Sequence, residues 1–383
     1  ATSGWNGSAY DNAKRLAGPF AILDTVYSAM LKIVSADSTV AMPALPINWS
    51  ILNFPGKSGD VTKGEIGTSK YSSEKNQLYI LGKENSDTDE YDDHVVAHEW
   101  GHYFENKFSR SDSLGSDHGS GEKLDPRVAF GEGFGNGFSG MCLDDPDYID
   151  SKGAQQGTVG LYMNLDDSNG DPESIGWFSE DSVQYILYQL YKNKSIGFKP
   201  FYTVFTGSQK TTDSFTTIHS FAYYMRQQYS SSEAAIDTLL NAKSITPPVN
   251  IWATTEANNG GDPKSLPVYN LLTVGGAAVV ICVNDEFGYY NKLMNRHFAY
   301  FEITQEREYT VTAQSKTAGG VPNIWVLLKG DFVAYTENKE SGTISTPAKK
   351  MSPGKYAVDI YDNRMKVQND PKIGEVCFDV TLN

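Results

Sequence analysis

The feature that most constrains this chain is a change in the spacing of its apolar residues near residue 245. Before that point, helical spacing is mixed with short strand-like runs, whereas after residue 267 apolar and polar residues alternate as in strands. The segment in between is rich in Pro, Asn and Gly and has no periodicity, which indicates a linker. We therefore predict two domains, at residues 1–245 and 268–383, joined by a linker at residues 246–267.

The first of these regions contains signals for helices and for short strands. Pro19 interrupts the first helical run, so a break or kink is expected there. Asp125 is a good N-cap and Pro126 suits the first position of a helix, so a helix should start at this pair. The expected elements are helices over residues 11–34 and 89–108, helix starts at 125–126 and 179–182, and strands over 47–52 and 77–81.

The second region shows only strand signals. Its apolar runs are short and are separated by turn-rich segments such as Gly319-Gly320 and Ser352-Pro353-Gly354. The expected strands cover residues 279–283, 299–303, 309–313, 324–328, 356–360 and 376–382. This spacing is typical of a small all-β sandwich, and the predicted fold class of the whole chain is therefore α+β.

Composition limits the partners of the chain. A formal net charge of −15, from 32 basic and 47 acidic residues, argues against nucleic acid and anionic membranes. The longest apolar run, at residues 274–283, is about half as long as a bilayer helix, so no membrane span is predicted. Because residues 1–5 lack the charge and apolar pattern of a signal peptide, we expect that such a peptide was removed or left out and that the protein is secreted or extracytoplasmic.

Three cysteines are too few for a disulfide scaffold. Cys282 and Cys377 can pair and leave Cys142 alone, or all three can be buried thiols. The sequence leaves both interpretations open.

The segment His98-Glu99-Trp100-Gly101-His102 falls inside the helix expected over residues 89–108. Residues four positions apart stand on one helical face, so both imidazoles can reach the same ion. Zinc accepts neutral imidazole and carboxylate ligands in a tetrahedral site and leaves one position for water. Glu99 is then placed to take the proton of that water during attack on a carbonyl group.

This segment resembles the HExxH motif of the zinc metallopeptidases known as zincins. The metzincin branch of that family would have Gly at position 105 and His at 108, and Glu105 and Phe108 exclude it. The gluzincin branch, which contains the thermolysin-like enzymes, takes a glutamate from a later helix. The segment at residues 130–136 looks like that second motif, so the resemblance implies Glu132 as the third zinc ligand.

The same resemblance assigns a role to Asn136. Thermolysin-like enzymes have an aspartate four residues after the ligand glutamate, where it orients a zinc-bound histidine, and Asn136 stands at that position. Glycines at 131, 133, 135, 137 and 140 indicate a close approach of this helix to the helix with the histidines. The likeness covers only residues 94–140, and the gap between His102 and Glu132 is longer than in thermolysin, so the exact family stays open.

Other polar residues near these motifs have weaker signals. His118 either polarises the scissile carbonyl, as a histidine or tyrosine does in related peptidases, or is an ordinary surface residue. His94 is one helical turn too far to share the ion, so we interpret it as a supporting or surface residue. Tyr185 and Tyr188 are interpreted as core residues. The acidic run at residues 166–171 misses the spacing of an EF-hand and is interpreted as a solvated turn.

The leading functional hypothesis is a secreted, Zn²⁺-dependent endopeptidase that acts on a protein or peptide. In this hypothesis His98, His102 and Glu132 hold the metal, and Glu99 and His118 are the catalytic residues. The second region resembles the pre-peptidase C-terminal sandwich of secreted bacterial peptidases in its pattern alone. Two alternatives remain, a non-catalytic binding or adhesion protein on a zincin scaffold and a zinc hydrolase of a non-peptide substrate. The oligomeric state is not predicted.

Overall fold

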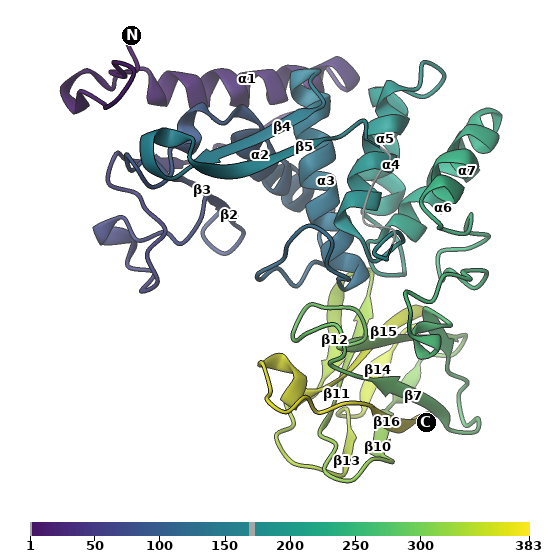
Figure 1. Cartoon of the computed structure of the whole chain (residues 1–383). Helices are drawn as coiled ribbons and strands as arrows, with labels where there is room; N and C mark the ends of the chain where they lie inside the picture. The colour runs from purple at the N-terminus through teal and green to yellow at the C-terminus, as the bar shows by residue number, and fades with distance from the viewer. Residues whose placement is uncertain (1, 168–172) are drawn as a thin grey trace. The chain divides into compact units, whose positions relative to one another are not determined.

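The structure is a computed structural model that describes residues 2–167 and 173–383 (Figure 1). The chain forms two compact units, and each of them combines segments that are distant in the sequence. The first unit consists of Ala1–Ser109, Glu132–Ser168 and Gln184–Tyr202, and the second of Arg110–Gly131, Asn169–Val183 and Thr203–Asn383. Helices occur together with several small sheets, which is compatible with the predicted α+β class.

The helices expected from the sequence are present, but two of them start later than predicted. The seven α-helices of the described residues are α1 (Gly18–Ala36), α2 (Asp93–Phe108), α3 (Pro126–Leu143), α4 (Glu180–Lys192), α5 (Phe198–Val204), α6 (Ile218–Gln228) and α7 (Glu233–Ala242). The first helix begins at Gly18 and not at residue 11, because Pro19 fits the first turn. Backbone N–H groups of the first turn have no partner within the helix, so the missing N–H of proline removes no hydrogen bond there. The second starts only at Asp93, after a separate 3₁₀ turn at Asp89–Tyr91.

Helix α1 packs against α2 through a buried stripe that includes Ile22, Val26, Ala29 and Ile33. Helix α1 is long and apolar enough to cross a membrane. Signal sequences and the core helices of soluble proteins meet the same criterion of length and composition. Of the apolar window that passes this test, 28% is buried. The absence of a membrane span therefore stays a prediction.

Two short strands of the first unit were expected and three were not. A three-stranded sheet has the order β1 (Ile47–Trp49), β3 (Gln77–Ile80), β2 (Lys70–Ser72), with β1 parallel and β2 antiparallel to β3. A separate hairpin pairs β4 (Asp147–Lys152) with β5 (Val159–Asn164). Strand β2 has only three residues and β4 is largely polar, so neither carries a clear alternating pattern.

The second unit contains all strands from β6 to β16 (Figure 1). They are β6 (Tyr269–Leu271), β7 (Val279–Val283), β8 (Arg296–Ile303), β9 (Arg307–Tyr309), β10 (Val311–Ser315), β11 (Pro322–Leu328), β12 (Asp331–Tyr335), β13 (Thr343–Ser345), β14 (Lys349–Met351), β15 (Gly354–Asp362) and β16 (Val376–Leu382). One sheet has the order β13-β10-β16-β7, another the order β12-β11-β15-β8-β6, and β9 pairs with β14. Five of the six expected strands are present, and the sixth, at residues 309–313, is divided between the end of β9 and the start of β10.

These two larger sheets share one hydrophobic core. The core includes Phe378 and Val380 of β16 from one sheet and Phe301 and Val358 from the other. Along β16, buried residues alternate with half-buried ones, as expected for a strand with one face toward a core. Residues 246–267 belong to the second unit, so the independence of the predicted domain at 268–383 stays a prediction.

A buried ion network holds the start of α3 in the second unit. Asp125 caps the helix by accepting the N–H of Arg127 at 3.0 Å, as its sequence position predicted. The guanidinium groups of Arg127 and Arg296 both donate to Asp359 of β15, at 2.9 and 2.7 Å. Because all four side chains are nearly inaccessible, removing one would leave an unpaired charge in the interior.

The disulfide Cys282–Cys377 joins β7 to β16, and Cys142 is a buried free thiol. This confirms the first of the two interpretations of the cysteines. The two bonded residues stand directly opposite each other in the antiparallel register.

Breaking this disulfide should lower the free energy of unfolding, because the crosslink spans 95 residues and restricts the unfolded chain. For a Cys282→Ser/Cys377→Ser variant we expect a loss of about 4 kcal/mol in urea unfolding monitored by circular dichroism. Cys142→Ala is the matched control, since it removes a buried thiol without removing a crosslink. Equal losses in both variants would contradict the expected role of the crosslink.

Candidate metal centre

Helix α2 presents His98 and His102 one turn apart on the same side. Their ring centroids are 4.6 Å apart and the rings are nearly perpendicular. The helix also buries Val96, Trp100 and Phe104 on its other sides. Asp93 in its first turn and a lysine in its last turn also suit the helix dipole. The predicted helical context of the two histidines is therefore present.

Helix α3 brings Glu132 to both histidines. Its Oε2 atom lies 3.4 Å from Nε2 of His98 and 3.2 Å from Nε2 of His102. One ligand atom from each of the three residues can be chosen so that all lie within 4.8 Å of one another. Four ligands placed tetrahedrally at about 2.0–2.1 Å from zinc are about 3.3 Å apart, so the two measured separations suit such an ion.

Glycine at position 135 allows α3 to come this close to α2. A Cβ atom on Gly135 would lie 2.7 Å from Cε1 of His98, a distance at which the imidazole would have to move. On the α2 side, a Cβ atom on Gly101 would lie 3.1 Å from the ring of Phe138. The expected close approach is thus found at Gly135. Gly137 and Gly140 instead face residues of other segments, among them Leu187 and Leu165.

A hydrogen-bond chain fixes the orientation of His98. Nδ1 of His98 lies 2.7 Å from Oδ1 of Asn136, and Nδ2 of Asn136 donates to Oε1 of Gln184 at 2.8 Å. With its amide nitrogen committed to Gln184, Asn136 offers its oxygen to His98, so Nδ1 carries the proton and Nε2 faces Glu132 with its lone pair. Gln184 was missed in the sequence, where it shows only as a polar residue inside an apolar run.

Glu99 is held beside this group by a backbone contact. Its Oε2 atom accepts the N–H of Tyr71, in β2, at 2.7 Å. Burial raises the pKa of Glu99, while the neighbouring His98 and His102 lower it in part. A carboxylate with a raised pKa is better able to accept a proton near neutral pH. The contribution of Tyr71 could not be found from sequence, because β2 has no clear strand pattern.

His102 forms an ion pair with Glu132. Burial alone would lower the pKa of His102, but the Glu132 carboxylate and, more weakly, Glu99 raise it to about 9. In the metal-free protein a proton on His102 therefore balances the charge of Glu132. A cation that binds here must displace that proton.

Two other residues of the sequence analysis lie away from this group. His94 is buried, so the surface interpretation is wrong, and its Nε2 atom lies 3.1 Å from the carbonyl oxygen of Asp145. Burial lowers its pKa. Tyr188 is 3% exposed and packs beside Gly140, which confirms it as a core residue.

The acidic run at 166–171 is described only in part. Residues 168–171 lie outside the described part of the chain, and Asp166 pairs with Lys192.

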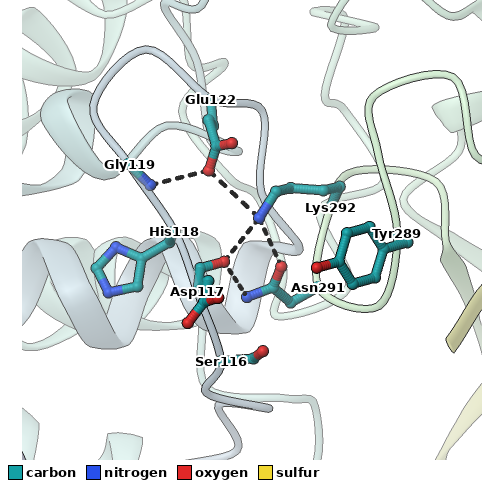
Figure 2. Close-up of a pocket in the computed structure, with 8 residues that line it drawn as sticks. All are labelled: Ser116, Asp117, His118, Gly119, Glu122, Tyr289, Asn291 and Lys292. Atoms are coloured by element: carbon teal, nitrogen blue, oxygen red, sulfur yellow. Dashed lines mark hydrogen bonds and ion pairs between the residues drawn. The ribbon is translucent and has the colours of Figure 1, made fainter. Parts of the chain in front are cut away.

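His118 belongs to the second unit, on an exposed loop that lines a pocket (Figure 2). Its Nδ1 atom lies 2.9 Å from Oε2 of Glu180, and its ring points away from Lys292 in Figure 2. The Nζ atom of Lys292 donates to the carbonyl of Asp117 at 2.8 Å and to Asn291 at 2.7 Å. Glu180 thus orients the imidazole, and the catalytic role of His118 stays a prediction.

Comparisons with known proteins add little to this geometry. No protein-family profile and no curated protein matches the chain. Three solved structures each match 30% of it. The first is the pre-peptidase C-terminal domain of a collagenase from Bacillus anthracis, with 14% identity, 94% of that chain covered and a TM-score of 0.22. The second is the surface-associated copper-binding protein CorA of Methylomicrobium album BG8, with 8% identity, 97% covered and a TM-score of 0.22. The third is the periplasmic lysozyme inhibitor PliG of Aeromonas hydrophila, with 13% identity, 98% covered and a TM-score of 0.19. These TM-scores are too low to support an argument.

The raised pKa of His102 predicts how metal binding depends on pH. Below its pKa of about 9, His102 must release a proton to bind a metal ion, so the apparent affinity for an added ion such as Zn²⁺ should rise about tenfold per pH unit for that proton. Between pH 7 and pH 8, competition with a chromophoric chelator should show this increase. In Glu132→Gln the carboxylate that raises the pKa is gone, so weaker binding with a smaller pH dependence is expected. An affinity that is the same at both pH values would contradict the predicted protonation of His102.

Proposed function

We propose that this chain is a zinc-dependent endopeptidase of the zincin type, with the metal held by His98, His102 and Glu132. The observation that carries the proposal is the convergence of their ligand atoms, with Oε2 of Glu132 at 3.4 and 3.2 Å from the two Nε2 atoms. Two imidazoles and one carboxylate are a ligand set of catalytic zinc sites that keep one position for water. Glu99, adjacent in sequence to the first ligand, supplies the base.

When bound, zinc would lower the pKa of its water to about 7 and polarise the carbonyl of the substrate. The residues of the chain then have separate tasks. Glu99 takes the proton of the attacking water, and we assign this to Oε1 because Oε2 accepts the N–H of Tyr71. It next delivers the proton to the leaving amine. Asn136 and Gln184 keep Nε2 of His98 turned toward Glu132, where it would hold the metal.

The position of β2 supports a peptide as the substrate. Strand β2 is at the edge of its sheet, where β3 is its one neighbour among the described residues, and the N–H of Tyr71 donates to Glu99. Extended peptides bind to proteins by adding a strand to such an edge. A peptide bound along β2 would therefore bring its carbonyl groups close to the general base.

Secretion is part of the same proposal. The disulfide Cys282–Cys377 supports it, since disulfides persist mainly in oxidising compartments outside the cytosol. The acidic net charge of −15 is in keeping with a soluble extracellular protein.

Two other functions use the same residues. A non-catalytic binding or adhesion protein would have no use for a carboxylate at position 99 with a raised pKa. A zinc hydrolase of a non-peptide substrate would share the chemistry, and only substrate screening separates it from an endopeptidase. A peptide-library digest without cleavage, with esters or amides of another class hydrolysed, would favour this second alternative.

Glu99→Gln should retain zinc and lose turnover, because an amide cannot accept the proton of the water. We expect kcat to fall about 100- to 10,000-fold in a peptide-library digest, with zinc content unchanged by elemental analysis. The matched control is Glu74→Gln, an exposed carboxylate in the turn between β2 and β3, which should keep full activity. Equal activity of wild type and Glu99→Gln would refute the mechanism.

Glu132 and His118 should respond in opposite ways to removal. Glu132→Ala takes away a proposed ligand and should weaken zinc binding at least about tenfold, as even the loss of a residue that supports a ligand does. His118→Ala should keep zinc and lose activity if the imidazole polarises the carbonyl. A metal titration in which His118→Ala loses zinc and Glu132→Ala keeps it would make His118 the ligand and refute the gluzincin assignment.

A further inference from the structure

A second cluster of possible ligands lies in the first unit and consists only of aspartates. Asp87, Asp89 and Asp92 surround the 3₁₀ turn Asp89–Tyr91 that precedes α2, and Asp150 comes from β4. One oxygen from each of the four carboxylates can be chosen so that all lie within 4.8 Å of one another. The first three residues are 7%, 3% and 7% exposed, and Asp150 is half-buried. None of the four belongs to the candidate zinc site.

Several oxygens of this cluster have no hydrogen-bond donor. Oδ1 of Asp87, Oδ1 of Asp89 and Oδ1 of Asp150 are buried, and none of them accepts a hydrogen bond from an N–H group or a hydroxyl of the described residues. By contrast, Oδ2 of Asp89 accepts from Ser69, and Asp92 accepts from the backbone and side chain of Ser151. Unpaired carboxylate oxygens in the interior are costly unless a positive charge faces them.

The described residues place little positive charge near the four carboxylates. Lys152 lies 3.7 Å from Asp150 and is the one cation paired with the cluster among the described residues. Four carboxylates against one ammonium leave a large negative excess in a partly buried space. Burial accordingly raises the pKa of Asp92 to about 7.

We propose that Asp87, Asp89, Asp92 and Asp150 form a binding site for one Ca²⁺ ion. Calcium binds oxygen ligands, carboxylates above all, at about 2.3–2.6 Å, so two ligands on opposite sides of the ion are about 4.6–5.2 Å apart. The oxygens of the cluster fit inside that span. Magnesium needs a tighter octahedron at about 2.0–2.1 Å and keeps several of its waters, so it should bind less well.

The ion would connect the β4–β5 hairpin to the start of α2. Asp92 directly precedes that helix, which carries His98, Glu99 and His102, and Asp150 lies near the middle of β4. Without an ion, β4 and the turn before α2 would repel each other through their carboxylates. Calcium should therefore stabilise the part of the first unit on which the proposed zinc ligands depend, although the calcium site itself does not require the proposed function.

A third group of possible ligands does not compete with this one. It contains Cys282, Glu375 and Cys377, and both sulfur atoms are already joined in the disulfide. A proton shared between Asp87 and Asp89 is the alternative to calcium, because burial and then the hydrogen bond and charge of Asp87 raise the pKa of Asp89. The experiment below distinguishes a shared proton from a cation.

Calcium binding can be tested on the full chain, freed of divalent ions on a chelating resin and reloaded with one equivalent of zinc. Isothermal titration with CaCl₂ should show one site, and calcium should raise Tm by at least about 2 °C. MgCl₂ should bind at least tenfold more weakly. No calcium uptake at millimolar concentration, and no change in Tm, would overturn the proposal and leave the shared proton as the explanation.

Asp89→Asn and Asp150→Asn should each weaken calcium binding at least tenfold. Because Asn removes repulsion in the empty cluster, the calcium-free variants should have a Tm at or above that of the wild type, which separates loss of the site from misfolding. The matched control is Asp147→Asn, on the same strand, whose carboxylate accepts from Tyr162 and Asn164 and lies outside the cluster. Calcium binding by Asp89→Asn as tight as by the control would contradict the assigned ligands. Neither readout measures zinc binding or peptide cleavage, so failure here is separate from failure of the proposed function.

Discussion

The candidate zinc site depends on the contact between α2 and α3 at Gly135. The missing side chain leaves room for the ring of His98, which lies where a Cβ atom would be. The same helix provides the two partners of the imidazole, three residues before Gly135 and one residue after it. Glu132 faces its Nε2 atom and Asn136 its Nδ1 atom. Any larger residue at 135 would push the ring away from both, so the ligand geometry follows from a packing constraint.

Helix α3 can serve this purpose because it is buried along almost its whole length. Every residue from 126 to 142 is buried, although glycines lower the intrinsic helix propensity of α3. Packing on all sides must supply the stability that propensity does not. Its first residues belong to the second unit, where Asp125, Arg127 and Asp359 form a buried network, and its later residues belong to the first. The division of the chain into units therefore runs through the helix that carries Glu132.

Buried charge is compensated in three different ways in this protein. Arg127 and Arg296 neutralise Asp359 with groups of the chain itself. His102 and Glu132 balance each other only while His102 holds a proton. The four aspartates before α2 and in β4 have one nearby lysine and several unpaired oxygens. The first arrangement uses arginines, which keep their charge, whereas the second depends on a proton that a cation can displace and the third sets one lysine against four carboxylates. This contrast is the physical reason to infer cations at the second and third.

Strands and helices with a strong local pattern could be predicted from the sequence. Five of the six strands expected after residue 267 are present and the sixth is divided between β9 and β10, and all of them contribute residues to the shared core. The helix starts at Pro126 and near residue 180 were also predicted by their capping residues. Strands β2, β4 and β5 were missed, and these are short or polar segments whose pairing depends on residues far away in the chain.

The sequence by itself determined the spacing of His98, Glu99 and His102, since residues four apart on a helix share a face in any fold. It also indicated Glu132 and Asn136, through a second motif and its glycines. Only the tertiary structure decided that Glu132 meets both imidazoles, that Gln184 orients Asn136, and that Tyr71 holds Glu99. It alone brought Asp150 to the aspartates before α2. Helical geometry is local and repeats with a fixed period, whereas these contacts join residues up to about sixty positions apart, and their distances are set by how the core packs.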